Sequence, residues 1–162
     1  MRRTILLMAT MALTLLVASG VALAGGATQI SGVATYADPG ECVDPEGAGA
    51  TYVPLDMTGD LEGCLYTFVD EDATQSSPSG TYRETGYEIF VASDGSGTFM
   101  TTYRFEGKYN LAGEEIFGRC QHPIVEGSGT GVFEGVSGIL LFKDVIEAGE
   151  DPYFPYRGHL RY

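Results

Sequence analysis

The segment Gly97–Asn110, GTFMTTYRFEGKYN, decides the fold class of this 162-residue chain. Every second residue from Phe99 to Phe105 belongs to one face, which also carries Thr101 and Tyr103, and the residues between them are mostly polar. A period of two is typical of a β-strand with one buried face. We therefore expect a strand here, with its aromatic face turned toward a core.

Similar segments recur along the chain. Thr81–Ala92 precedes the first segment across a short loop that contains Asp94 and Gly95, a pair typical of tight β-hairpins. No segment shows a sustained helical period, and further runs of aromatic and β-branched residues lie between turn residues. Additional strands are expected at Gln29–Tyr36, Leu61–Val69, Glu115–Val125, Ile139–Val145 and Tyr153–Tyr162.

Seven or eight strands joined mainly by short turns form either a sandwich or a barrel. We favour an all-β fold with a single antiparallel β-barrel of about eight strands. The reason is that pairing the first strand with the last leaves no exposed edge.

The first 24 residues have the pattern of a secretory signal peptide. Arg2 and Arg3 precede a long apolar run, and Ala22–Ala24 supplies a small-residue cleavage site. The run Thr4–Val21 is almost long enough for a membrane anchor, but no basic stop-transfer cluster follows it. We expect cleavage, a single domain at 25–162, a secreted or extracytoplasmic location and no membrane attachment of the mature chain.

The composition argues against several partners. With 9 Lys and Arg against 22 Asp and Glu, the formal net charge is −13, which repels nucleic acid and anionic lipid. The carboxylates are scattered without a calcium-loop motif, there is no C-x-x-C pair, and His122 and His159 lie far apart in the sequence. We therefore expect no nucleic-acid partner, no metal and no cofactor.

Three cysteines, Cys42, Cys64 and Cys120, lie beyond the signal peptide. In an exported chain, one disulfide and one free thiol are the simplest arrangement. We predict a Cys42–Cys64 bridge that pins a long loop, 37–53, to the barrel wall, because Cys64 and Cys120 belong to strands separated by two others. A Cys120–His122 nucleophile pair stays open, although a spacing of two only places both residues on one strand face.

A second segment, Gly127–Val145, reads GSGTGVFEGVSGILLFKDV and is rich in glycine. A phosphate-binding glycine loop needs a helix after it, whereas Ile139–Phe142 continues as a strand. The glycines are therefore expected to allow tight turns and close approach of chains at a barrel rim.

Within that segment, GTGVFEGVSG at Gly129–Gly138 resembles a motif of dirigent proteins and of the allene oxide cyclase barrel group. With LEGCLYTF, TYRFEGKY, EIFGRCQHPIV and YRGHLRY, the chain is similar to uncharacterised secreted bacterial members allied to that barrel. The resemblance implies an eight-stranded antiparallel barrel with a central apolar cavity. In plant members the cavity guides a reactive intermediate, but no catalytic motif of those enzymes matches here residue by residue.

The first functional hypothesis is that the barrel interior binds a small apolar or aromatic molecule. We place His122 on a strand face shared with Ile116 and Cys120. The expected lining consists of Tyr66, Phe68, Tyr103, Phe105 and His122. The alternative is that these side chains are packed as core.

A second hypothesis is an enzyme of the dirigent or cyclase kind, which needs polar groups inside an apolar pocket. The candidates are Glu84, Arg104, Arg119 and His122, although alternation places Arg104 opposite the aromatic face of its strand. If all four lie on the outer wall, this hypothesis fails. A third is a cell-surface structural or interaction module, since ten tyrosines suit a dimer contact. We expect a monomer or a small homo-oligomer.

Overall fold

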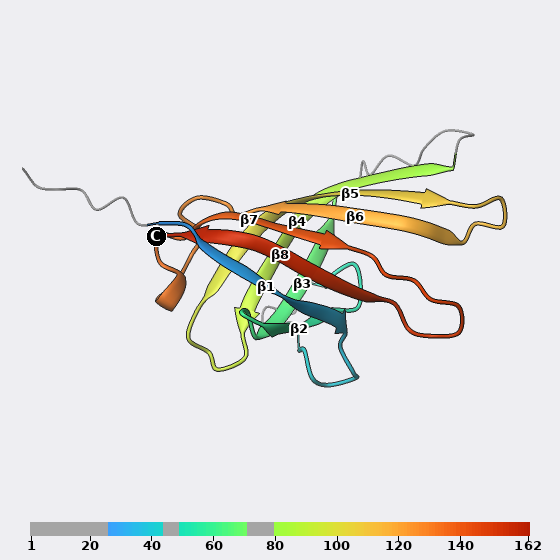
Figure 1. The fold of residues 1–162 in the computed structure, drawn as a ribbon. Helices are drawn as coiled ribbons and strands as arrows, with labels where there is room; N and C mark the ends of the chain where they lie inside the picture. The colour runs from blue at the N-terminus through green and yellow to red at the C-terminus, as the bar shows by residue number, and fades with distance from the viewer. Residues whose placement is uncertain (1–25, 44–48, 71–79) are drawn as a thin grey trace, which may run out of the picture.

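The computed structural model describes residues 26–43, 49–70 and 80–162. Within these residues, eight antiparallel strands form one closed barrel in which each strand pairs with its neighbour in the chain and β1 pairs with β8 (Figure 1). The strands are β1 (Thr28–Tyr36), β2 (Leu55–Gly59), β3 (Gly63–Val69), β4 (Thr81–Ala92), β5 (Thr98–Tyr109), β6 (Glu115–Pro123), β7 (Ser137–Lys143) and β8 (Tyr153–Arg161). The prediction of a single closed antiparallel barrel is confirmed. The predicted signal peptide, 1–24, lies outside the described residues.

One strand was missed from the sequence. β2 is five residues long and buries a single side chain, that of Met57. It directly follows the long loop and pairs with both β1 and β3. A segment this short has too few alternating residues to show a period of two.

The interior is closed at one end by an apolar plug. Between β6 and β7 the chain forms a short 3₁₀-helix, η1 (Gly131–Phe133), whose Phe133 ring packs edge-on against Phe90 and Phe99. At Gly131, φ is 58°, and a Cβ atom would lie 1.9 Å from the carbonyl oxygen of Ser96. This glycine is required by backbone conformation and close packing, as the sequence predicted.

A β-bulge lies at the opposite end of the barrel. The register between β5 and β6 shifts next to Lys108 and Tyr109, so that Tyr109 pairs with Glu115 and skips Ile116. Ile116 is 61% exposed, whereas Cys120 and His122 are buried. The expectation that Ile116 shares their face is wrong, because the extra residue of the bulge reverses the alternation.

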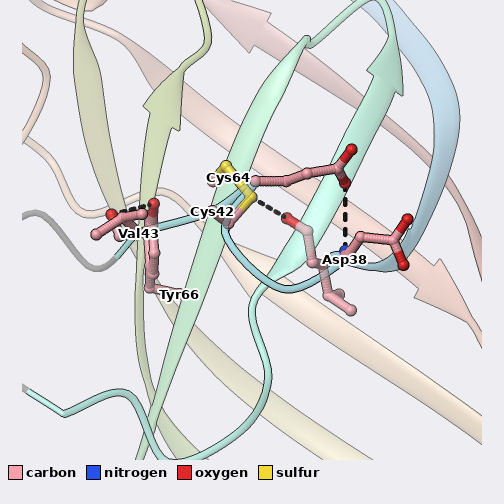
Figure 2. Close-up of a disulfide and its surroundings, with 7 residues drawn as sticks. Asp38, Cys42, Val43, Cys64 and Tyr66 are labelled. Carbon is pink, nitrogen blue, oxygen red and sulfur yellow. Dashed lines mark hydrogen bonds between the residues drawn. A yellow bond between two sulfur atoms is a disulfide. The ribbon is translucent and has the colours of Figure 1, made fainter.

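The predicted Cys42–Cys64 disulfide is present, with the two Cα atoms 5.7 Å apart (Figure 2). It fixes the loop after β1 against the outer face of β3. Nearby, the Tyr66 hydroxyl donates a hydrogen bond to the Val43 carbonyl oxygen at 2.8 Å. Cys120 is free and buried. None of the described residues belongs to a helix with the length and apolar character that a membrane span requires.

Candidate functional site

A cavity of about 270 Å³ occupies the end of the barrel opposite Phe133. All eight strands contribute to its wall, chiefly with the last residues of β1 and β5 and the first residues of β2, β4, β6 and β8, and Tyr52 and Val53 of the long loop complete it. Eight aromatic side chains line it: Tyr36, Tyr52, Tyr82, Tyr103, Phe105, Tyr109, Phe142 and Phe154. The open end of the barrel is therefore an aromatic pocket of the size of a small ligand.

Glu84 lies in this pocket and is 4% exposed. Its Oε2 atom accepts hydrogen bonds from the hydroxyls of Tyr52 at 2.6 Å and Tyr82 at 2.5 Å, and its Oε1 atom accepts one from Tyr103 at 2.5 Å. Burial, followed by the hydrogen bond to Glu84, raises the pKa of all three tyrosines. The phenols are therefore protonated donors at neutral pH, and Tyr52 attaches the long loop to the barrel interior.

A second buried carboxylate, Glu88, lies deeper on the same face of β4. It accepts hydrogen bonds from the hydroxyls of Thr67 and Thr101, both at 3.0 Å, and its Oε2 atom is hydrogen-bonded to Nδ1 of His122. The imidazole is 3% exposed and packs against Phe142, with ring centroids 4.4 Å apart. Its Nε2 atom has no hydrogen-bond partner among the described residues. Glu88 thus fixes the orientation of a histidine whose other nitrogen is unpartnered.

A third acidic group, the carboxylate pair, consists of Glu115 and Asp144. Both line the cavity, and both rest on Gly118, where a Cβ atom would lie 2.2 Å from Oε1 of Glu115 and 2.3 Å from Oδ2 of Asp144. The Tyr109 hydroxyl donates a hydrogen bond to Oε2 of Glu115 at 3.3 Å. Burial, and then the hydrogen bond and charge of Glu115, raise the pKa of Asp144 to about 7. Near neutral pH the two carboxyl groups therefore hold a proton between them.

Cys120 also lines the cavity, but His122 is hydrogen-bonded to Glu88. Burial, followed by the charge of Glu88, raises the pKa of the Cys120 thiol. A thiol protonated at neutral pH is a poor nucleophile, so the geometry does not support a cysteine–histidine nucleophile pair.

The structure divides the predicted ligand-lining residues into two groups. Tyr103, Phe105 and His122 line the cavity, whereas Tyr66 and Phe68 do not. Alternation along β3 turns Leu65 and Thr67 inward, so these two aromatic side chains lie on the outer face. There the Tyr66 hydroxyl is hydrogen-bonded to the long loop, and Phe68 stacks on Tyr87 with ring centroids 4.8 Å apart. They are buried because the loop covers the outer face of this strand.

The predicted catalytic candidates are divided in the same way. Glu84 and His122 lie inside the cavity, so the condition that would have ended the enzyme hypothesis is not met. Arg104 is exposed, and Arg119 forms an ion pair with Glu106 at 2.9 Å outside the cavity. Neither arginine can serve the interior from these positions.

Sequence reasoning missed Glu88 and the carboxylate pair. A signal for Glu88 existed, because alternation along β4 places Glu84, Glu88 and Phe90 on one face. No comparable signal marked Glu115, which the bulge turns inward, or Asp144, which follows the end of β7.

The cavity wall is rich in carboxylates and lacks basic residues. Among the described residues that line it, four are acidic, one is histidine and none is lysine or arginine. Within the described part of the chain, no group of three or more His, Cys, Asp and Glu side chains is arranged to hold a metal ion.

The chain matches no family model, no curated protein and no solved structure. Its function therefore has to be inferred from the chemistry of the cavity itself.

Proposed function

We propose that this protein binds a small apolar or aromatic molecule in the cavity at the open end of the barrel. The observation that carries the proposal is the difference between the two ends. One end is filled by Phe90, Phe99 and Phe133, whereas the other leaves about 270 Å³ among aromatic side chains. A barrel of about eight strands has room either for packed side chains or for one small ligand.

The buried polar groups support a role beyond packing. Glu84, Glu88 and His122 are all nearly inaccessible to solvent, and burying ionisable groups costs free energy that a purely structural core avoids. Groups of this kind in an aromatic pocket are characteristic of binding and active sites.

The disulfide supports an extracytoplasmic location, because such bonds persist in oxidising compartments. The closed eight-stranded antiparallel barrel also agrees with the architecture that the dirigent and allene oxide cyclase resemblance implies. The proposal includes that the chain is a secreted relative of that barrel group. Detection of the protein outside its producing cells, cleaved after Ala24, would test its secretion.

Indole is a suitable probe for the proposed binding. The chain has no tryptophan, so indole emission excited beyond the absorption of tyrosine can be followed without a tryptophan background. We expect saturable binding with a blue shift of the emission, as the ring leaves water. If neither indole nor any other small aromatic molecule, neutral or cationic, shows saturable binding to the folded protein, the proposal is refuted.

Two matched variants locate the binding. Leu55→Phe enlarges a side chain of the cavity wall, whereas Val33→Phe enlarges one on β1 that is exposed and outside the cavity. We expect Leu55→Phe to weaken indole binding and Val33→Phe to leave it unchanged. Equal effects of the two variants would place the binding elsewhere.

A second candidate function, proton-transfer catalysis, is favoured by one specific observation. Glu88 orients His122 through Nδ1, and Nε2 has no partner in the described part of the chain, which is the arrangement of a carboxylate-assisted general base. The test substrate is 5-nitrobenzisoxazole, in which loss of a C–H proton to a base accompanies cleavage of the N–O bond. Saturable elimination that is lost in His122→Gln would support catalysis, whereas a rate equal to that of buffer would leave binding alone.

A further inference from the structure

The four carboxyl groups of the cavity differ in how the protein compensates them. Three tyrosine hydroxyls donate to Glu84, and two threonine hydroxyls and His122 are bonded to Glu88. Beyond the proton that its own two members share, the carboxylate pair receives one long hydrogen bond among the described residues, from Tyr109. Uncompensated negative charge is therefore concentrated at Glu115 and Asp144.

The protein supplies no cation to this pair from the cavity wall, which contains no lysine or arginine among the described residues. A carboxylate that is partly withdrawn from water and has few hydrogen-bond donors can be stabilised by a positively charged partner. Since the pair borders an open cavity, a ligand can provide that partner.

The surrounding surface is suited to an organic cation rather than to an inorganic one. Tyr36 and Tyr109 lie close enough to the pair that both of its charges raise their pKa values. Phe154 packs edge-on against Tyr36, with ring centroids 5.3 Å apart. The faces of such rings attract ammonium groups, and their apolar surface accommodates the rest of an amine.

His122 provides an independent indication of a polar ligand. It lines the same cavity, and its buried Nε2 atom has no hydrogen-bond partner among the described residues. A polar group of a ligand would satisfy this nitrogen, whereas a hydrocarbon would not.

We propose that the molecule bound in this cavity is an organic cation, an amine with an aromatic or apolar body whose ammonium group contacts Glu115 and Asp144. This inference rests on the proposed function, because it specifies the chemical class of the ligand in the same cavity.

The carboxylate pair also couples binding to pH. The titratable groups that face Asp144 are Glu115 of β6, Tyr36 of β1, Tyr109 of β5 and, more distantly, Cys120 of β6. Among these four groups and Asp144 itself, the carboxylate pair takes up a proton as the pH falls below about 7. A bound ammonium group competes with that proton, so affinity for a cation falls on acidification.

The test compares benzylammonium with ethylbenzene, which has the same shape with a methyl group in place of the ammonium group. Binding to the purified protein is measured at pH 8 and pH 5, with moderate salt to screen the acidic surface. We expect benzylammonium to bind at least about tenfold more tightly than ethylbenzene at pH 8, a difference that one desolvated charge contact readily supplies. The preference should shrink at pH 5.

The test variant carries Glu115→Gln and Asp144→Asn together. The control variant is Glu134→Gln, on the exposed surface at the closed end. The double variant should lose the preference for benzylammonium and keep ethylbenzene binding, and Glu134→Gln should change neither. Thermal unfolding without ligand reports whether each variant is folded.

The outcomes separate the two proposals. If ethylbenzene or indole binds saturably and benzylammonium binds no more tightly, the inference of a cationic ligand is overturned while the small-molecule function stands. If the preference persists in the double variant, the inference is overturned as well. If no neutral or cationic probe binds, the proposed function itself is refuted. The comparison of benzylammonium with ethylbenzene at pH 8 uses the unaltered protein, so it decides whether the cavity prefers a cation even if the double variant fails to fold.

Discussion

Replacing Asp144 by asparagine should stabilise the protein at alkaline pH and leave its stability unchanged in acid. The pKa of Asp144 is raised from 3.8 to about 7 by burial and by Glu115. The folded state holds this proton more tightly than the unfolded state, so ionising Asp144 lowers the free energy of unfolding. This loss of stability is absent below about pH 4, grows between pH 4 and 7 and is complete above pH 7.

The size of this loss follows from the difference between the two pKa values, 3.8 and about 7. At about 1.4 kcal/mol per pKa unit, the upper bound is roughly 4 kcal/mol. Since Asp144 is only partly buried, screening by solvent reduces this to roughly 2 kcal/mol. Asparagine resembles the protonated acid and can donate a hydrogen bond to Glu115. We therefore expect Asp144→Asn to raise the free energy of unfolding by roughly 2 kcal/mol at pH 8 and by almost nothing at pH 4.

Urea unfolding of both proteins at pH 4, 6 and 8, without reductant, measures this difference. Asp151→Asn is the matched control, because Asp151 is exposed in the same connection between β7 and β8. It should change stability by less than about 0.5 kcal/mol at every pH. A gain in Asp144→Asn that is equal at pH 4 and pH 8, or a loss at pH 8, would refute the reasoning.

Three further predictions concern other parts of the barrel. Replacing Cys42 and Cys64 by serine should lower the free energy of unfolding by about 3 kcal/mol in urea, because the bridge joins residues 22 positions apart in the sequence. An unchanged midpoint would contradict this. Gly118→Ala should hardly change thermal stability, because the added Cβ atom meets only the ends of side chains. It should weaken benzylammonium binding about tenfold, because it displaces the carboxylate pair. Unchanged affinity would contradict this prediction. Phe133→Ala should cost about 3 kcal/mol in urea without changing indole affinity, and a parallel loss of binding would show that the two ends are coupled.

The fold was predictable because its strands alternate clearly. Phe99, Thr101 and Tyr103 are buried as the period of two in β5 requires. Closure by pairing of β1 with β8 was expected because the strands are joined mainly by short turns and this pairing leaves no exposed edge. The Cys42–Cys64 pairing was also predictable, because two strands separate Cys120 from Cys64.

The site was only partly predictable, because its composition depends on features that leave no periodic signal. Tyr66 and Phe68 are buried like interior residues, but the covering layer is a loop outside the barrel. Glu115 turns inward through a bulge that cannot be read from the residues alone. Tyr52 reaches Glu84 from a loop 32 residues away in sequence. Tertiary contacts of this kind override local alternation.

The separation of the two ends explains how the barrel tolerates buried charge. On one face of β4, Phe90 belongs to the apolar plug, whereas Glu84 and Glu88 face the cavity. The plug supplies hydrophobic stabilisation independently of the cavity, so the carboxylates need not contribute to folding. Neutralising a carboxylate that stabilises the fold lowers the free energy of unfolding. Neutralising a carboxylate that serves binding raises it, because the cost of burying the charge is removed. The sign of the stability change in Asp144→Asn at alkaline pH therefore bears on function: a gain means that the carboxylate pair is maintained at the expense of stability, as expected for a site whose positive partner arrives with the ligand.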